Sequence, residues 1–199
     1  MSKRGVLVSG LDIDILINFY NSLLKNILSF NNNKVYLFNS YKKYNNIMGI
    51  PNVINSNYVE YLNQLKNFAM KLDNKNEINY FICFLGIYDI YSSFDILLKK
   101  EFNNILKLLN EKDNVSTIFI EASNVLKKLE FEEFYKSNIN NNRGIWIGNG
   151  VSEQMILKSG RMPREYRDTI TDKFGFVFEN GIITKIKLLD YFNGDENEE

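Results

Sequence analysis

Residues 78–85 read Ile78-Asn79-Tyr80-Phe81-Ile82-Cys83-Phe84-Leu85, which is a nearly continuous apolar run in a chain of 199 residues. A strand with apolar side chains on both sides is buried on both faces, as strands are in parallel sheets that helices cover. We therefore expect this run to be a central strand of an α/β sheet.

The chain on either side of this run alternates between strand-like and helical patterns. Apolar residues recur at helical spacing over residues 15–30 and 58–72, and Ser92 and Asp95 mark the start of a further helix. Asn180-Gly181 joins two β-rich runs and predicts a hairpin near the C-terminus. The remaining predicted elements are strands at 5–9, 34–39, 115–120 and 144–148 and a short helix at 124–129.

This order of elements predicts an α/β fold with a mainly parallel sheet and helices on both faces. We expect a single domain over residues 1–192, because no linker divides the chain. Residues 193–199 contain acids and no base, so we expect a solvated, disordered tail there.

The composition excludes several classes of enzyme and partner. The chain has no His and one Cys, which excludes Ser-His-Asp and Cys-His catalysis, His-ligated metals and a thiolate-rich zinc site. Its 24 basic and 24 acidic side chains give a net charge of zero, which argues against general nucleic-acid binding. No run of about 18 apolar residues is present, so we expect no insertion of this chain into a membrane.

The first strand-to-helix turn is the place where a sheet of this kind would hold phosphates. A phosphate loop follows the pattern G-x-x-x-x-G-K-[ST], and Gly10 stands at its first position. Ile15, Leu16 and Ile17 then stand where the second glycine, the lysine and the hydroxyl residue belong. We interpret this stretch as a degenerate phosphate loop that is nearly inert in phosphoryl transfer.

Acidic residues near the same edge complete the candidate nucleotide pocket. Asp12 and Asp14 put negative charge where phosphates would lie, and Glu121 follows the predicted strand at 115–120. Asp89 comes a few residues beyond the central run, and we interpret it as a turn or helix-cap residue. The candidate pocket thus consists of Gly10, Asp12, Asp14 and Glu121, with no catalytic residue and no metal ligand. Its cofactor would be either none or Mg-ATP that is bound without efficient turnover.

Arginines concentrate between residues 143 and 167. Arg161, Arg164 and Arg167 are spaced by three, so on a helix they would lie along one side. This spacing fits a solvated basic face, or a surface that binds an acidic partner through the planar guanidinium groups. Pro163 suits the first turn of a helix that starts there. We keep the three arginines as candidate partner-binding residues.

Motifs in the last third of the chain carry a resemblance to a known family. They are Ile118–Ser123, Gly144–Gly150 with Gln154, Phe174–Val177 and Ile186–Leu189. Together they resemble a RecA-like domain of the FtsK/SpoIIIE superfamily, and above all the third, C-terminal ATPase-like domain of the EssC family of type VII secretion motors. The first two thirds match only as α/β order with a degenerate phosphate loop. The resemblance implies a three-layer fold of the P-loop NTPase type.

The resemblance also implies a function. In this family the later ATPase-like domains often lack the catalytic loop residues. Related third domains are implicated in docking the C-terminal signal of secreted helical-hairpin proteins with a Trp-x-Gly turn. The implied partners are such proteins and the other ATPase domains of the same motor, without nucleic acid. The chain would then be a cytoplasmic domain of a membrane-anchored secretion protein.

Four hypotheses follow from the residues and the resemblance together. The preferred one is a catalytically silent ATPase-like module that recognises secreted substrates or regulates its motor. The alternative is a nucleotide-binding domain or weak ATPase with a non-standard loop. A DNA-translocase fragment is suggested only by the superfamily, and a purely structural oligomerisation domain remains a fourth possibility.

Overall fold

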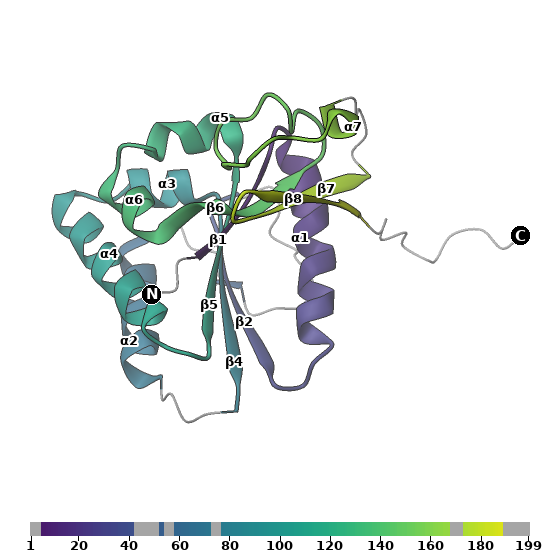
Figure 1. Ribbon diagram of the computed structural model, residues 1–199. Coiled ribbons are helices and arrows are strands. Elements are labelled where there is room, and N and C mark those ends of the chain that lie inside the picture. The colour runs from purple at the N-terminus through teal and green to yellow at the C-terminus, as the bar shows by residue number, and fades with distance from the viewer. Residues whose placement is uncertain (1–4, 42–51, 54–57, 73–76, 168–172, 189–199) are drawn as a thin grey trace, which may run out of the picture.

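The computed structural model describes residues 5–41, 52–53, 58–72, 77–167 and 173–188, which form an eight-stranded sheet between layers of helices (Figure 1). The strands lie in the order β3-β2-β4-β5-β1-β6-β7-β8. Neighbours from β3 to β6 are parallel, whereas β7 is antiparallel to both β6 and β8. The strands are β1 (Gly5–Gly10), β2 (Asn33–Asn39), β3 (Asn52–Val53), β4 (Asn79–Leu85), β5 (Val115–Ala122), β6 (Ile139–Ile147), β7 (Phe174–Glu179) and β8 (Ile182–Lys187). The predicted mainly parallel sheet is confirmed.

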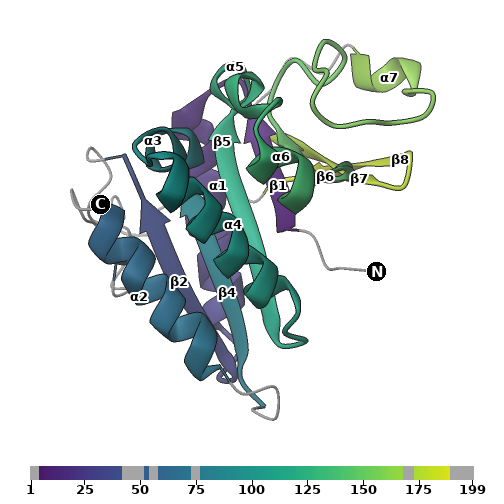
Figure 2. The same ribbon diagram turned by 90° about the vertical axis from the view of Figure 1, so that its left-hand side faces the viewer.

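Helices cover both faces of the sheet, as predicted (Figures 1 and 2). Helix α1 (Ile13–Leu28) lies on one face, and α2 (Tyr58–Lys71), α4 (Ile96–Asn110) and α6 (Glu133–Asn138) lie on the other. The remaining helices are the short α3 (Ile87–Ser92), α5 (Ser123–Leu126), the 3-10 helix η2 (Lys127–Leu129) and α7 (Arg164–Arg167). None of the described helices is long and apolar enough to span a membrane.

Strand β4 has the double burial that its apolar run predicts. Tyr80, Ile82 and Phe84 point into the core under α2, α4 and α6, while Cys83 and Leu85 point into the core under α1. Because side chains alternate along a strand, an apolar residue at nearly every position fills both cores at once.

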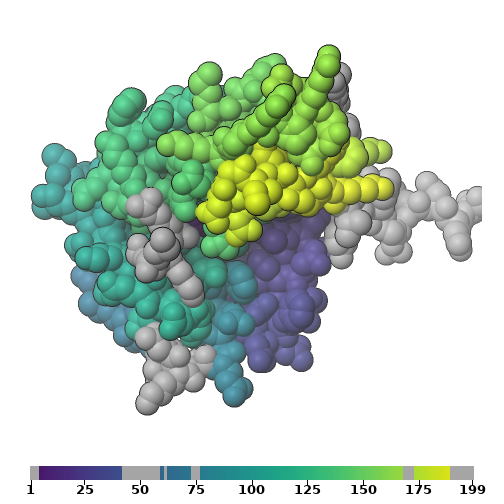
Figure 3. Space-filling view, viewed as in Figure 1, coloured from purple at the N-terminus to yellow at the C-terminus, as the bar shows by residue number. Residues whose placement is uncertain are grey.

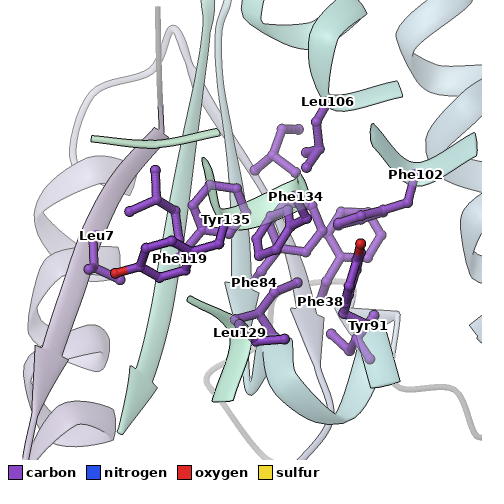
Figure 4. Close-up of a cluster of buried hydrophobic side chains, with 14 of the residues drawn as sticks. Leu7, Phe38, Phe84, Tyr91, Phe102, Leu106, Phe119, Leu129, Phe134 and Tyr135 are labelled. Carbon is purple, nitrogen blue, oxygen red and sulfur yellow. The ribbon is translucent and has the colours of Figure 1, made fainter. Parts of the chain in front are cut away.

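The larger core is rich in aromatic rings (Figure 4). The Phe84 ring stacks on Phe38 and Phe119 at centroid distances of 5.0 and 5.2 Å. Phe134 meets the Phe119 ring edge-on at 5.3 Å, and Phe102 lies 5.6 Å from Phe134. These contacts join α4 and α6 to the centre of the sheet, and they use the offset and edge-on geometries that aromatic pairs prefer.

The antiparallel end of the sheet contains the predicted hairpin. Asn180 and Gly181 have φ values of 50° and 88°, which is the left-handed pair that a two-residue hairpin turn requires. Figure 3 shows the hairpin β7–β8 between the segment that contains α7 and helix α1. Trp146 on β6 is fully buried and belongs to the core.

Three local features differ from the sequence prediction. Ser92 ends the separate helix α3, and α4 begins at Ile96, where Asp95 caps it by accepting a hydrogen bond from the Leu98 amide at 2.8 Å. Helix α6 was not predicted, because its six residues are too few for a periodic pattern. Strand β6 begins at Ile139, five residues before the predicted start, in an Asn-rich stretch of low strand propensity. The acidic tail at 193–199 lies outside the described residues.

Candidate functional site

The carboxyl ends of five parallel strands meet at one edge of the sheet, called the carboxyl edge below. The strands end there at Gly10, Asn39, Leu85, Ala122 and Ile147. Ligands of open α/β sheets bind at this edge. Both groups of sequence-predicted pocket residues, the turn after β1 and Glu121 on β5, lie here, because β1 and β5 are neighbours in the sheet.

The connection from β1 to α1 consists of Leu11 and Asp12 alone. Asp12 is the N-cap of α1, and its Oδ1 accepts a hydrogen bond from the Asp14 amide at 2.7 Å. The cap therefore places a carboxylate of the chain itself at the start of the helix, where a phosphate would otherwise accept amide hydrogen bonds. Gly10 is needed for close packing, since a Cβ there would lie 2.6 Å from the Ile147 carbonyl oxygen.

The three positions that would complete a phosphate loop lie inside helix α1. Leu16 and Ile17 are only 0% and 4% exposed, and both belong to the core between α1 and the sheet. Ile15 packs against the same core from a partly buried position. These side chains thus serve the packing of α1, and neither a cation nor a hydroxyl faces the edge from them.

Glu121 makes several hydrogen bonds at the carboxyl edge, although it is only 1% exposed. Its Oε1 accepts hydrogen bonds from the Tyr41 hydroxyl at 2.6 Å and from the Ala122 amide at 3.0 Å. Its Oε2 accepts one from the Tyr88 amide at 3.0 Å, and Ser9 Oγ donates to its carbonyl oxygen at 2.8 Å. One buried residue therefore ties together the ends of β1, β2, β4 and β5.

Burial dominates the electrostatics of this carboxyl group. It raises the pKa of Glu121 above the ordinary value, while the hydrogen bonds from Tyr41, Tyr88 and Ala122 act against that rise. The Asp89 carboxylate adds a smaller increase, because a second negative charge disfavours ionisation. Burial, with Glu121 as the next cause, also raises the pKa of the Tyr41 phenol well above its usual range. No Lys or Arg among the described residues pairs with Glu121.

Sequence reasoning identified Glu121 but missed its partners. Tyr41 follows β2, eighty residues earlier in the chain, and only the parallel packing of β2, β4 and β5 brings the two together. Nothing in the sequence distinguishes Tyr41 from the eleven other tyrosines. Asp89 was predicted to be a turn or helix-cap residue, but it lies inside the first turn of α3, whose N-cap is Gly86. Its negative charge contributes to the raised pKa of Glu121.

The three arginines lie apart from this pocket. Arg164 and Arg167 are the ends of the short helix α7, which begins after Pro163, and Arg161 precedes that helix. Helix α7 is held on the sheet by Tyr166, whose ring lies 5.5 Å from that of buried Phe176 on β7. All three arginines are exposed, and none pairs with a carboxylate among the described residues. They form what is called the Arg surface below.

The described residues contain no cluster of three or more His, Cys, Asp or Glu side chains that could hold a metal ion. Cys83 is buried, and its burial raises the pKa of the thiol to about 12. A thiol with that pKa stays protonated and packs as a small apolar group.

Comparison with known proteins gives structural matches only. No family model matches the chain, and no curated protein matches it. Among solved structures, EssC (ATPases 2 and 3) from Geobacillus thermodenitrificans superposes with a TM-score of 0.70 at 15% identity over 94% of this chain. The cytoplasmic domain of EssC gives a TM-score of 0.68 at 14% identity over 94%.

A third match is Thermomonospora curvata EccC (ATPases 2 and 3) in complex with a signal sequence peptide, with a TM-score of 0.62 at 8% identity over 94% of this chain. This chain spans 37% to 39% of the length of these three structures. Similarity at such low identity establishes the fold. The chain therefore has the RecA-like fold of the cytoplasmic ATPase domains of EssC and EccC.

Proposed function

We propose that this chain is a catalytically silent ATPase-like domain of a type VII protein-secretion motor, which recognises the C-terminal signal segment of secreted substrates or regulates the motor. One observation carries the proposal: the turn between β1 and α1 has two residues and ends in the Asp12 cap. A phosphate chain needs free amides and a cation at this turn. The residues present do not fit that need, so no hydrolytic step is assigned to them.

The Arg surface supports a role in binding an acidic segment. A guanidinium group can donate two parallel hydrogen bonds to one carboxylate. Each of the three exposed arginines, which have no acidic partner among the described residues, can therefore bind one carboxylate of a partner. The EccC structure with a bound signal peptide makes such a segment a reasonable ligand for a domain of this fold. Other ATPase domains of the same motor, in the cytoplasm, are the second class of partner that we propose.

Two titrations test this function. Calorimetry of the purified chain with millimolar Mg-ATP is expected to give no heat. Labelled peptides from the C-terminal tails of helical-hairpin proteins with a Trp-x-Gly turn are expected to bind, whereas scrambled peptides are not. Failure of every tail peptide, at low as well as physiological salt, would contradict substrate recognition.

A matched pair of variants locates the binding surface. Arg161→Gln, Arg164→Gln and Arg167→Gln combined should weaken tail binding about tenfold or more, since each exposed charge pair is worth up to about 1 kcal/mol. The control removes the same charge from exposed lysines on other elements, by Lys100→Gln, Lys107→Gln and Lys127→Gln. Equal losses in both variants would mean that net charge, and not the Arg surface, determines affinity.

The presence of Glu121 at the carboxyl edge favours one second candidate, a nucleotide-binding domain or weak ATPase with a non-standard loop. Micromolar binding of Mg-ATP with slow hydrolysis, both lost in Glu121→Gln or Asp14→Asn, would establish that function instead. Adenine and ribose contacts do not require a lysine, so binding without turnover would leave the proposal of catalytic silence intact.

A further inference from the structure

Two residues that follow β2 lie against the ends of the neighbouring strands. The Ser40 amide donates a hydrogen bond to the Leu85 carbonyl at 3.0 Å, and Ser40 Oγ donates to the Gly86 carbonyl at 2.9 Å. The Tyr41 amide donates to Asn39 Oδ1 at 2.9 Å, which turns the chain so that the Tyr41 side chain reaches across to β5. Side-chain hydrogen bonds thus link the end of β2 to the ends of β4 and β5, in addition to the backbone pairing of β2 with β4.

Gly86, after β4, is shaped to receive these residues. It adopts the left-handed conformation at φ 78°, and its amide donates to the Ile120 carbonyl at 3.0 Å. A Cβ at this position would overlap Ser40 Oγ and would lie 2.9 Å from Tyr41 Cε2. Only glycine fits this conformation and this close approach without strain. The Tyr41 side chain thus lies in a site, called the seat below, that is formed by Gly86 after β4 and by Glu121 on β5.

The hydrogen bond at the end of this seat has the geometry of a strong one. The distance of 2.6 Å between the Tyr41 hydroxyl and Glu121 Oε1 lies in the range of O–H···O⁻ bonds to an ionised group. The other groups near the carboxyl are two backbone amides and the Asp89 carboxylate, and Lys128 lies over the Tyr88 ring at 5.0 Å. The phenol is the side-chain donor that the structure gives to this buried carboxyl group.

We propose that Tyr41 is an internal ligand of the carboxyl edge, a latch whose phenol occupies the seat formed by Gly86 and Glu121 and closes that seat to external molecules. The latch goes beyond the proposed recognition of substrates and does not depend on it. The contact can open without unfolding the sheet, because Tyr41 follows the last residue of β2 and is not part of a strand. Opening it exposes a carboxyl group that is otherwise covered.

Limited proteolysis tests the latch, because Lys42 and Lys43 directly follow Tyr41 in the sequence. Tyr41→Phe keeps the ring and removes the hydroxyl, so trypsin cleavage after these lysines should speed up about tenfold, as expected for the loss of one hydrogen bond to a charged group. Exchange of the β4 and β5 amides should stay unchanged. Tyr36→Phe, which removes a hydroxyl from β2, the strand that precedes Tyr41, is the control and should leave cleavage unchanged.

A cleavage rate close to that of the unmodified chain would overturn the latch. A rate that rises only in step with exchange of the core amides would also overturn it, because it would report global unfolding. The same Tyr41→Phe protein should bind tail peptides at the Arg surface with unchanged affinity. Failure of the latch and failure of the proposed function therefore give different results.

Chemical rescue tests the seat itself. Tyr41→Gly should create a cavity, and 4-methylphenol, the detached tyrosine side chain, should raise the thermal midpoint of this variant by about 3 °C or more. Toluene, which lacks the hydroxyl, should raise it less, and the unmodified chain should respond to neither compound. Equal effects of the two compounds, or an equal effect on the unmodified chain, would contradict an occupied seat in front of Glu121.

Discussion

The protonation of Glu121 depends on the groups that surround its carboxyl in the folded chain. It is buried at the end of β5 and is satisfied by one phenol and two amides. Burial without a cation makes the proton more tightly bound in the folded chain than in the unfolded chain. The stability that this tighter binding contributes is fully present below the unfolded pKa and is lost as pH rises through the folded pKa.

The pH dependence of stability should therefore reveal Glu121. Relative to Glu121→Gln, the unmodified chain should lose unfolding free energy as the pH is raised from about 4.5, the ordinary carboxyl value. The loss is about 1.4 kcal/mol for each unit by which folding raises the pKa. Urea unfolding of both proteins between acid and neutral pH measures it. If the unfolding free energy of the unmodified chain rose with pH relative to that of Glu121→Gln, the hydrogen bonds would lower the pKa of Glu121 more than burial raises it.

Gly10 allows two strands to pack closely, although it stands at the first position of a phosphate-loop pattern. Gly10→Ala places a methyl group 2.6 Å from the Ile147 carbonyl, an atom of the backbone that cannot move aside easily. We expect a loss of about 2 kcal/mol in unfolding free energy, as for other overpacked sites. Ser116→Ala on an exposed position of β5 is the control, with a change within about 0.5 kcal/mol. Equal stability of both variants would contradict the close approach of β1 and β6.

The packing and capping of helix α1 explain the residues of the degenerate phosphate loop. Its buried residues Leu16, Ile17, Tyr20, Leu24 and Ile27 recur at helical spacing and fix the helix on the sheet. In place of a phosphate, the side chain of Asp12 satisfies the start of the helix. The loop is short because α1 already begins at Ile13. Residues 15–17 therefore lie inside the helix, where aliphatic side chains pack against the sheet.

Substitution of the cap tests this account of α1. Asp12→Ala removes the acceptor for the Asp14 amide and should cost about 1 kcal/mol of unfolding free energy, whereas Asp12→Asn should keep most of it. Thermal or urea unfolding of the two variants side by side measures the difference. If inorganic phosphate restored the stability of Asp12→Ala, the helix start would have kept a capacity for anions, against the interpretation given above.

The elements differ in how far the sequence could predict them. The apolar run of β4, the hairpin at Asn180-Gly181 and the stripe of α1 follow from local patterns, because each pattern is long or chemically specific enough to identify its element. Helices α3 and α6 are only six residues long, and the first half of β6 is rich in Asn, so tertiary contacts and not local preference determine them. In the candidate site, the position of Glu121 at the carboxyl edge was predictable because it lies at the end of an apolar strand, whereas its role in a nucleotide pocket stays a prediction. Its partner Tyr41 depends on the order of strands across the sheet, which no local pattern contains.

At the scale of the whole molecule, charge is distributed unevenly although it sums to zero. Residues 158–188 contain seven basic and four acidic side chains, and the Arg surface lies among them. The three arginines of the Arg surface suffice for the proposed acidic segment, but they are too few to neutralise many phosphates along a duplex. Fold alone does not determine function, so the surface charge of this chain is the property that bears on whether it could bind DNA.

A DNA-binding measurement decides between the proposed secretion module and a DNA-translocase fragment. We expect no shift of duplex DNA at physiological salt, and any binding at low salt should weaken steeply as salt is added, with a slope set by the few cations of the Arg surface. The variant with glutamine at positions 161, 164 and 167 should abolish that residual binding and also weaken the acidic tail peptides. A chain that held DNA tightly at physiological salt, with affinity unchanged in this variant, would have a cationic path elsewhere on the molecule. That result would favour a DNA-translocase fragment over a secretion module.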